Sequence, residues 1–589
     1  MKLSFGLLAL SLMAGAAILN LVACGGGGGS VTTTATTTTI TPVSITSFAA
    51  NPSTIASGSS SSLTAIFSGG SGMITPGNIV VTSGTPVAVS PTATTTYTLT
   101  VTPTTGAANA TSQATITVNS GGSTTTVSID PSATGVPVTD ELLGMNLAVW
   151  FDITGANGQA VVTAFQNAGI KAVRWPGGSD SDVYNWSTNT ACAATYTNSN
   201  DTFANFVTNI VKPGNFDLAL TADYGSNAAC NGPGDATEAA AWLTAALNDG
   251  VTVSHMTVGN EEYGTWEEDM HTPASSQHNP AVYANEMVGG SGFYQSIKSA
   301  SPNTMVGVVV DADNAPGGWD DTILNNAKGY YDFVEFHYYP EAPGSENDTF
   351  LVQQAGPGLT NELNIIKQEL AAAGEPNLPI YVGEMGSVYS SPGKQSWSIT
   401  QGLYAGQTLG EMMNAGVSRA TWWIGFGNCD GQNGNDSASL YGWQTFGAYN
   451  VFSDGSEDPT CPNAGPIGTM SPTAVAFQLF SHVAVKGENV LTPSVAGDTT
   501  DIRAYAATHS GGTVVVLFNL DQTTSELVQL ALTGVSSSTD VKQYSYDKSI
   551  YDLTQTNVWN GPATIDLGAQ TLPMTVTLTP WSMNVFVIQ

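Results

Sequence analysis

Met256-Thr-Val-Gly-Asn-Glu-Glu-Tyr-Gly-Thr-Trp266 is an apolar, β-branched run that ends in an amide, two carboxylates and an aromatic loop. The pattern predicts a buried strand with Asn260 and Glu261 at its carboxyl end. A second run, Leu378-Pro-Ile-Tyr-Val-Gly-Glu-Met-Gly386, has the same design and ends at Glu384. Two carboxylates at the ends of two buried strands are the minimum set for cleaving a glycosidic bond, one as proton donor and one as nucleophile.

Eight short apolar runs alternate with helical patterns between about 140 and 484. The runs are 142–147, 172–175, 218–222, 256–259, 305–310, 333–338, 380–383 and 420–424. Eight strands, each followed by a helix, predict a (β/α)8 barrel whose chemistry lies at the carboxyl ends of the strands. Glu261 and Glu384 fall at the ends of strands four and seven.

Polar and aromatic side chains follow several other predicted strands. They are Asn146 and Trp150 after strand one, Arg174 on strand two, His337 and Tyr339 on strand six, and Trp422 and Trp423 on strand eight. Period-two geometry puts His337 and Tyr339 on one face, where they are placed to orient Glu384. Taken singly, each residue has a structural alternative, such as core packing or, for Arg174, a buried ion pair. Their occurrence at the same strand ends favours one site that holds a sugar by hydrogen bonds and stacking.

Composition limits the possible partners. The chain has 589 residues, of which 41% are apolar, enough for the cores of three or four domains. Lys and Arg number 13 against 46 Asp and Glu, so the formal net charge is −33. This charge repels phosphate backbones and anionic membranes, and we expect no nucleic-acid partner. The sequence gives no sign of a cofactor or of an obligate protein partner.

The N-terminus has the features of an export signal. Residues 1–23 contain Lys2 and an apolar run over 7–22, as a secretory signal peptide does. Leu21-Val-Ala-Cys24 resembles the bacterial lipobox, which implies lipidation of Cys24, and the alternative is an ordinary signal peptide with a chance cysteine. Residues 24–43 are Gly- and Thr-rich and predict a flexible linker. We therefore expect an exported protein, lipid-anchored at a bacterial cell surface or outer membrane, or secreted, that meets a membrane only through this anchor.

Four further cysteines support export. Cys192, Cys230, Cys429 and Cys461 form an even set in a chain bound for an oxidising compartment. Local pairs, 192 with 230 and 429 with 461, are expected. No cysteine has the C-x-x-C spacing or the neighbouring histidines of a zinc site, so we expect no metal.

The regions on either side of the barrel predict β-structure. Residues 44–119 alternate polar and apolar side chains between Gly, Ser and Pro turns, and they resemble the bacterial Ig-like modules of surface enzymes. Residues 120–127 are expected to be a linker before a catalytic barrel over 128–484. Alternating strands over 485–589 predict a C-terminal β-sandwich, which the first strand, 128–137, is expected to join.

The motifs of the barrel resemble those of the retaining glycoside hydrolases of clan A. The resemblance rests on Gly-Asn-Glu at strand four, His-x-Tyr at strand six, Gly-Glu at strand seven and Trp at strand eight, and it covers roughly 128–589. Arg174-Trp-Pro-Gly-Gly and Tyr184-Asn-Trp186 are similar to the family 51 arabinofuranosidases and the family 44 endoglucanases. Gly177-Gly-Ser-Asp-Ser-Asp182 and His337-Tyr-Tyr are closer to the heparanase and β-glucuronidase family.

The resemblance implies a role for each residue. Glu261 would be the acid/base, Glu384 the nucleophile, and Asn260 the donor to the sugar 2-hydroxyl, with Glu262 as the rival acid. We expect a raised pKa for the acid and an ionised nucleophile stabilised by Arg174 and Tyr339. The expected activity resembles that of an α-L-arabinofuranosidase. The alternatives are a β-glucuronidase or heparanase-like enzyme, an endo-β-glucanase, and a non-catalytic surface glycan-binding protein.

Overall fold

The computed structural model describes residues 43–56, 60–91, 93–104, 108–119, 125–155, 157–192, 197–427, 429–430, 435–455 and 461–589. The signal peptide, Cys24 and all but the last residue of the 24–43 linker lie outside these residues, so the three expectations stay predictions. None of the helices in the described part is both long and apolar enough to cross a membrane.

The central element is a closed parallel barrel of eight strands, as the sequence predicted. In order around the sheet they are β10 (Gly144–Asn146), β11 (Ala172–Trp175), β14 (Asp217–Ala222), β15 (Val253–Val258), β16 (Met305–Val309), β17 (Phe333–Tyr338), β18 (Ile380–Met385) and β19 (Arg419–Ala420). Backbone bonds close the ring between the first and last strands: Asn146 N–H donates to Trp422 O over 2.9 Å, and Trp422 N–H donates to Gly144 O over 3.0 Å.

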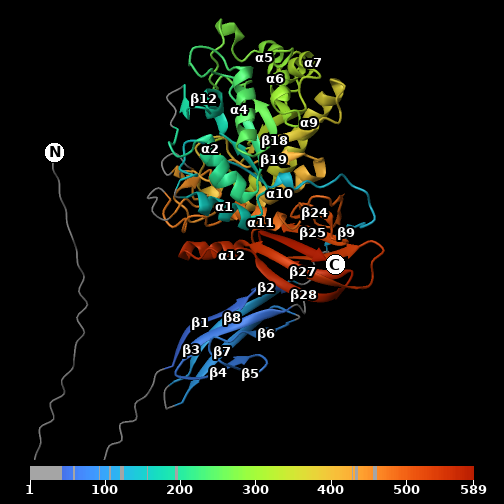
Figure 1. Ribbon diagram of the computed structural model, residues 1–589. Coiled ribbons are helices and arrows are strands. Elements are labelled where there is room, and N and C mark those ends of the chain that lie inside the picture. Colours follow the sequence, from blue (N-terminus) through green and yellow to red (C-terminus); the bar gives the residue numbers. More distant parts are fainter. Residues whose placement is uncertain are drawn as a thin grey trace, which may run out of the picture. The chain divides into compact units, whose positions relative to one another are not determined.

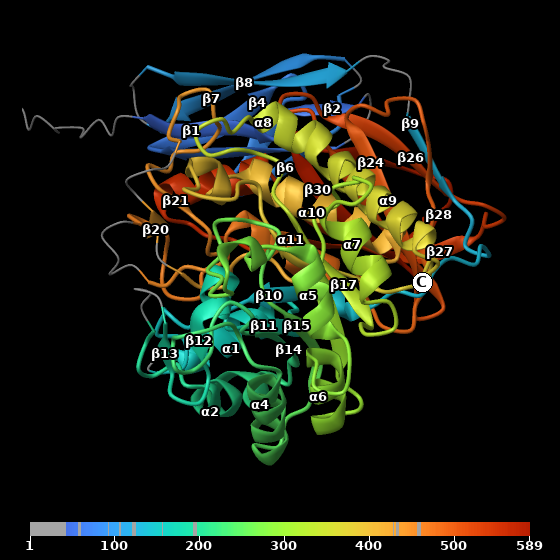
Figure 2. The ribbon, with the colours of Figure 1, turned by 90° about the horizontal axis from the view of Figure 1, so that it is seen from above.

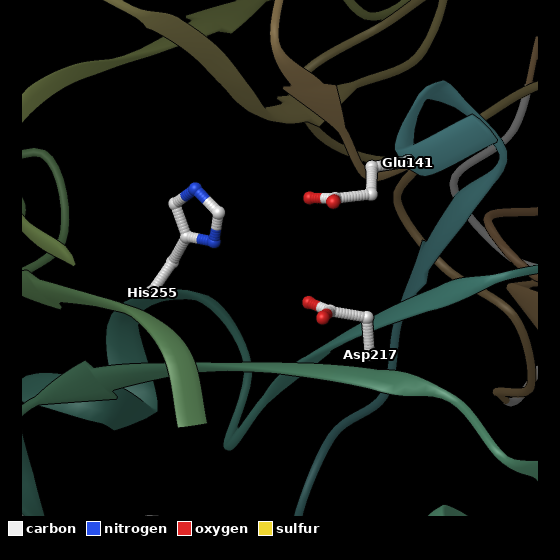
Figure 3. A group of neighbouring side chains, drawn as sticks. All are labelled: Glu141, Asp217 and His255. Atoms are coloured by element: carbon white, nitrogen blue, oxygen red, sulfur yellow. The ribbon is translucent and has the colours of Figure 1, made fainter. Parts of the chain in front are cut away.

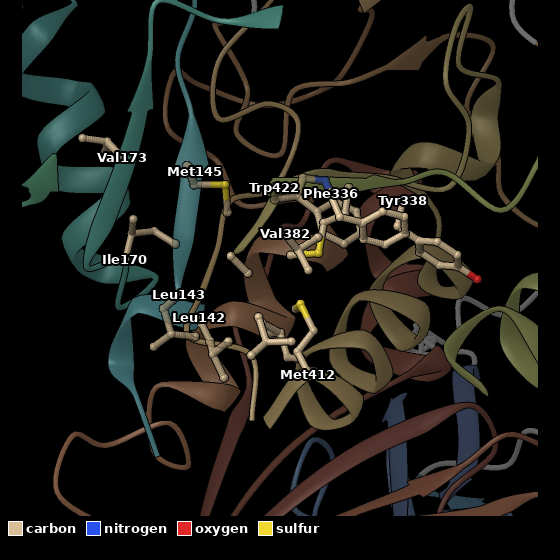
Figure 4. Packing of buried hydrophobic residues seen from close by; sticks show 14 of the residues in the cluster. Leu142, Leu143, Met145, Ile170, Val173, Phe336, Tyr338, Val382, Met412 and Trp422 are labelled. Carbon is tan, nitrogen blue, oxygen red and sulfur yellow. The ribbon is translucent and has the colours of Figure 1, made fainter. Parts of the chain in front are cut away.

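Helices follow the strands and cover the barrel (Figure 1, Figure 2). The longer ones are α1 (Gly158–Asn167), α4 (Ala236–Asn248), α5 (Pro280–Met287), α6 (Phe293–Ala300), α7 (Trp319–Asn326), α9 (Gly356–Ala372), α10 (Ile399–Ala415) and α11 (Pro472–Phe480). Because the strands are buried on both faces, their sequences are almost continuously apolar rather than alternating. Figure 4 shows part of the resulting packing, and Met145, Val173 and Val382 from three strands belong to the same buried cluster as Met412 of α10.

The C-terminal region forms two sheets. In the larger sheet the strand order is β22 (Val490–Leu491), β24 (Ile502–His509), β25 (Gly512–Asn519), β30 (Ser582–Ile588), β27 (Ser538–Asp547) and β28 (Ala563–Thr571). In the smaller sheet the order is β23 (Ser494–Ala496), β9 (Thr125–Ile129), β26 (Glu526–Leu532) and β29 (Met574–Leu578). β9 begins at Thr125, inside the range 120–127 that was expected to be a linker. Its Val127 and Ile129 are fully buried in the core of these sheets, so the chain enters this sandwich before it enters the barrel.

Helix α10 joins the barrel to the larger sheet. Gly406 and Gly410 face the sheet, and a Cβ on Gly410 would lie 2.5 Å from the ring of Tyr505 in β24. The absence of a side chain therefore lets helix and sheet approach closely. The hydroxyl of Tyr505 donates to Glu411 of α10 over 2.8 Å, which fixes the two layers by a directional bond as well as by burial.

The described residues of the N-terminal region form strands and turns. One sheet contains β1 (Ser44–Asn51), β3 (Ser61–Ser68) and β6 (Val87–Val89), and the other contains β2 (Thr54–Ala56), β8 (Ala110–Asn119), β7 (Thr95–Pro103), β4 (Gly70–Thr75) and β5 (Ile79–Val81). Buried side chains alternate with exposed ones along β7, where Tyr97, Leu99 and Val101 point inward. This is the period-two pattern of a sheet with one covered face.

One of the two expected disulfides is confirmed. Cys192 and Cys230 are bonded, with their Cα atoms 5.2 Å apart. Cys461 also forms a disulfide, but the side chain of Cys429 lies outside the described residues. The pairing of 429 with 461 therefore stays a prediction.

The amino-terminal end of the barrel holds a partly buried charge cluster. Glu141, Asp217 and His255 point toward one another (Figure 3), and their ligating atoms lie within 4.8 Å. Arg419, at the start of β19, donates to both Glu141 and Asp217. Burial and the nearby Arg419 charge lower the pKa of His255 to about 3, so the imidazole is neutral at ordinary pH. The guanidinium balances the carboxylates, and the cluster stabilises the barrel at the end opposite the candidate site.

Candidate active site

The carboxyl ends of four barrel strands converge on one group of polar side chains. Arg174 comes from β11, Asn260 and Glu261 from the turn after β15, His337 and Tyr339 from the end of β17, and Glu384 from β18. Glu261 does not sit on the strand itself, because β15 ends at Val258, and its backbone φ is +49°. The tight turn points its carboxylate toward His337.

Glu384 is buried and held from two sides. Its Oε1 accepts from Arg174 Nη1 over 3.0 Å, and its Oε2 accepts from the Tyr339 hydroxyl over 2.9 Å. Both bonds stabilise the ionised form and fix the carboxylate plane. This is the environment that the sequence predicted for a nucleophile.

Glu261 is more accessible, with 19% of its side chain exposed. Its Oε1 lies 2.7 Å from His337 Nδ1, and its Oε2 accepts from the Trp266 indole over 2.8 Å. An oxygen of Glu261 and an oxygen of Glu384 lie within 4.8 Å of each other, with His337 beside both. The two carboxylates therefore face the same small volume.

Glu335 is a central residue that the sequence did not single out. It is buried, and it pairs with Arg174 over 3.0 Å and with His337 Nε2 over 3.3 Å. Despite burial, which acts to raise it, the pKa of Glu335 falls to about 2 because of the charges and hydrogen bonds of Arg174, His337 and Thr257. Glu335 thus supplies the fixed negative charge that holds both cations in place.

The pKa directions of the two candidate catalytic carboxyls differ from expectation. Burial raises the pKa of Glu384, although His337 and Arg174 partly oppose it. For Glu261, burial is outweighed by the hydrogen bond and charge of His337 and by the Trp266 bond, so its pKa is lowered. The cause is geometric, because His337 Nδ1 lies 2.7 Å from Glu261 but 3.7 Å from Glu384.

His337 is itself held in the charged form. Burial acts to lower its pKa, but Glu384, Glu261 and Glu335 together raise it to about 10. Its two ring nitrogens face two different carboxylates, which requires a proton at both contacts. With Arg174, this imidazolium balances the carboxylates and leaves little charge for a metal ion among Glu261, His337 and Glu384.

Two residues expected to contact substrate are instead structural. Asn146 is fully buried, its Nδ2 donates to the backbone oxygens of Gly383, Thr421 and Trp422, and its Oδ1 accepts from Arg174 over 3.0 Å. It therefore closes the barrel and orients Arg174. Trp422 is 1% exposed and belongs to the hydrophobic core near Met145 and Phe336 (Figure 4). Strand-end position alone did not reveal that both side chains point inward.

Asn260 stays a candidate for the sugar contact. Its Oδ1 accepts from Arg174 Nη2 over 2.8 Å, and its Nδ2 donates to Glu267 over 3.0 Å. One of its two amide N–H groups is thus used by the protein. Its backbone N–H donates to the Asp182 carboxylate, which fixes the turn that also carries Glu261.

Glu262, the rival acid, points away from Glu261 and Glu384. It is fully buried beside Asp182 and Asp269, and burial and the neighbouring Asp182 carboxyl raise its pKa well above the ordinary value. Because its side chain is fully buried, Glu262 has no path to a substrate oxygen. The structure therefore leaves Glu261 as the carboxyl of this turn that reaches the site.

Aromatic side chains occupy the rim. Trp150 and Trp423 are half-buried, with ring centroids 6.1 Å apart, and a Cβ on Gly178 would lie 2.7 Å from the Trp423 ring. Two further aromatics, Trp266 and Tyr389, are 66% and 59% exposed. Each lies five residues beyond a candidate catalytic glutamate. The sequence analysis noted the aromatic loop that contains Trp266 but did not select Trp266 or Tyr389 as candidate substrate contacts.

The fold is shared with known glycoside hydrolases. A family 51 α-L-arabinofuranosidase from Bifidobacterium longum matches with a TM-score of 0.59 and 15% identity, over 80% of this chain and 100% of that one. The arabinofuranosidase of that family from Xanthomonas axonopodis pv. citri gives 0.57 and 16%, over 79% and 100%. A Paenibacillus polymyxa xyloglucanase of family 44 gives 0.54 and 13%, over 79% and 99%.

These likenesses establish the fold of the barrel with its C-terminal strands. The chain matches no protein-family model and no curated protein sequence. The chemistry of the site therefore has to be argued from its own residues.

Proposed function

We propose that the chain is a retaining glycoside hydrolase acting on plant-type polysaccharide or oligosaccharide, with α-L-arabinofuranosidase-like activity. The observation that carries the proposal is the pair Glu261 and Glu384, whose oxygens approach within 4.8 Å at the ends of strands four and seven. Retaining enzymes keep their carboxyl groups roughly 5 Å apart, whereas inverting enzymes need roughly 6.5–9.5 Å for a water between them. The fold shared with arabinofuranosidases and glucanases agrees with this reading.

Glu384 and Glu261 each have a role in the two displacements of the proposed reaction. Glu384, ionised and aligned by Arg174 and Tyr339, attacks the anomeric carbon while Glu261 protonates the departing glycosidic oxygen. A covalent glycosyl-enzyme forms, and Glu261 then removes a proton from the water that attacks the same carbon. Two displacements retain the anomeric configuration.

His337 explains how Glu261 can serve as an acid although its own pKa is lowered. The Glu261–His337 contact of 2.7 Å holds one proton, on the imidazole in the free site. When a leaving oxygen replaces water beside Glu261 and charge develops there, this proton is available across a single hydrogen bond. Glu261 and His337 therefore titrate as a pair, and the pair keeps its proton through neutral pH.

Replacing His337 by Asn is expected to move the alkaline limb of the kcat/KM profile to lower pH by about one unit or more. The raised pKa of His337, about 10, means that its proton is bound below that pH and lost as pH rises through it. Without the imidazole, Glu261 alone must retain the proton. The profile is measured on a substrate with a poor leaving group.

Tyr339→Phe is the matched control for this profile. It removes a hydrogen bond that lowers the pKa of Glu384, so the acid limb of the kcat/KM profile moves to higher pH. The alkaline limb stays at the same pH. An unchanged alkaline limb in His337→Asn would show that the imidazole does not supply the proton to Glu261.

The charges of the site favour a neutral sugar. The Nη1 and Nη2 groups of Arg174 are shared by Glu384, Asn260, Asn146 and Glu335. The remaining Nε–H is buried, so the guanidinium offers no accessible donor to a substrate carboxylate. Burying a uronate without a cation is costly. The β-glucuronidase and heparanase alternative is therefore the weaker one.

The endo-acting alternative has an observation of its own. Trp266 and Tyr389 expose large rings beyond the two catalytic strands, and the Trp266 indole bonds Glu261 directly. Rings of this size stack on successive sugars of a chain. A non-catalytic glycan-binding protein would use the same rings without needing the glutamate pair.

A substrate panel tests the proposal. Aryl arabinofuranoside, xyloside, glucoside and glucuronide are compared with polymeric xylans and glucans, using Glu384→Gln as the blank. We expect fastest turnover of the arabinofuranoside and release of monosaccharide. Preference for the glucuronide would overturn the sugar assignment, and release of long oligosaccharides from β-glucan would establish the endo alternative.

A further inference from the structure

A second carboxylate cluster lies on the outer part of the barrel, away from Glu384. Asp313 follows β16, Asp320 lies in the first turn of α7, and Glu369 lies near the end of α9. One oxygen from each can be chosen so that all three lie within 4.8 Å of one another.

The loop orients two of these carboxylates through one oxygen each. Asp320 Oδ1 accepts from the backbone N–H of Asp311 over 2.9 Å, and Glu369 Oε1 accepts from the N–H of Asn314 over 2.9 Å. The remaining oxygens, Asp320 Oδ2 and Glu369 Oε2, are buried and accept no hydrogen bond from an N–H or hydroxyl group of the described residues, and the two carboxyls share a hydrogen bond with each other. Asp320 is itself fully buried. An ionised carboxylate oxygen in that position needs a positive partner.

Two of the other acidic clusters have such a partner and this one does not. Arg419 neutralises the cluster of Glu141 and Asp217, and Arg174 with His337 neutralises the candidate active site. Within the described part of the chain, no salt bridge reaches Asp313, Asp320 or Glu369, and the nearby charges that act on them are carboxylates.

We propose that Asp313, Asp320 and Glu369 bind a divalent cation, Ca²⁺. The donors are all oxygens, and the cluster contains no nitrogen or sulfur ligand of the kind that zinc prefers. An open pocket of about 290 Å³, lined in part by Asn314, Asp321 and Glu369, lies beside the cluster. It gives the ion an entry path and room for the water ligands that Ca²⁺ keeps when the protein supplies few donors.

The bound ion ties the loop after β16 to α9. Asp311, which anchors Asp320 through its N–H, interacts electrostatically with Glu261. The cation would therefore brace the strand-five loop at the edge of the site. Its direct effect is on stability, because none of its three ligands contacts Glu261 or Glu384.

Thermal unfolding of the full chain tests this inference. After treatment with EGTA, addition of millimolar CaCl2 is expected to raise the Tm of the barrel transition by about 2 °C or more, because the ion binds only the folded state. Glu369→Gln and Asp320→Asn are expected to lose this response. Glu141→Gln, in the Arg419 cluster, is the control that keeps it.

Equilibrium dialysis with Ca²⁺ gives the second readout. The wild type is expected to bind one ion more than Glu369→Gln, whose side chain is half-buried and tolerates the change more easily than Asp320. No Tm shift and no bound Ca²⁺ in the wild type would overturn the proposal and leave Asp320 and Glu369 sharing a proton. Equal binding by wild type and Glu369→Gln would overturn it as well.

Discussion

Glu384→Ala is expected to lower the hydrolysis of an activated aryl glycoside by at least about 10⁴-fold, a loss of about 5.5 kcal/mol of transition-state stabilisation. The reason is that no other carboxylate can take its place, since Glu261 is turned toward His337 and Trp266 and Glu335 is held by Arg174 and His337. The measurement is kcat/KM on the best aryl glycoside of the panel.

Azide separates the roles of the two glutamates. In Glu384→Ala the anion attacks the substrate directly from the vacated side, so the glycosyl azide has inverted configuration. In Glu261→Ala the glycosyl-enzyme still forms from a good leaving group, and azide then gives a product of retained configuration. The variant also loses far more activity on poor leaving groups than on good ones, because only the former need the proton.

Glu268→Gln is the matched control, since this exposed carboxylate lies in the same loop as Glu261 and makes no contact with either candidate residue. Its kcat/KM should equal that of the wild type. Activity of Glu384→Ala within tenfold of wild type would contradict the assignment of Glu384 as nucleophile and Glu261 as acid/base. Azide products with the two configurations exchanged would contradict it as well.

The barrel could be predicted from the sequence because its evidence is local. Each strand is a short apolar run that ends at a polar residue, and eight such runs alternate with helices, so the number and order of strands follow from the pattern. Glu261 and Glu384 stood out because charged residues directly after a buried parallel strand can face only the barrel mouth or the loops above it.

The predictions that were wrong concern how deeply a side chain is buried and in which direction it points. The position of a residue at the end of a strand reveals neither. Asn146 and Trp422 occupy the same level as Arg174, but hydrogen bonds to backbone oxygens and core packing turn them inward. Glu335 was not predicted as a site residue, although the period of two places it on the same face of the strand as His337. The pKa directions were missed for a similar reason, since they follow from a difference of about one ångström between two His337 contacts that no sequence pattern encodes.

Arg174→Met is expected to destabilise the barrel by about 3–5 kcal/mol at neutral pH, because it removes the guanidinium from two buried carboxylates and leaves them only the imidazolium of His337. Glu335 and Glu384 are both within 3.0 Å of the guanidinium, and both side chains are almost fully buried. Methionine keeps much of the volume, so the loss measures charge rather than a cavity. Arg503→Met in β24 is the control, since this side chain is half-buried and bonds only to the nearby backbone oxygens of Thr499 and Thr500.

The pH dependence gives this prediction its signature. The pKa of Glu335 is depressed to about 2 in the folded protein, so its contribution to stability is present above the ordinary carboxyl pKa of 4.5 and is lost as pH falls toward 2. In Arg174→Met only His337 and Thr257 still lower the pKa of Glu335 against the effect of burial, so the pKa rises and this contribution shrinks. The difference between wild type and variant, followed by denaturant unfolding at several pH values, should therefore be largest near pH 7 and shrink below about pH 4.5. A loss that is independent of pH would mean that Arg174 acts through packing and not through its charge.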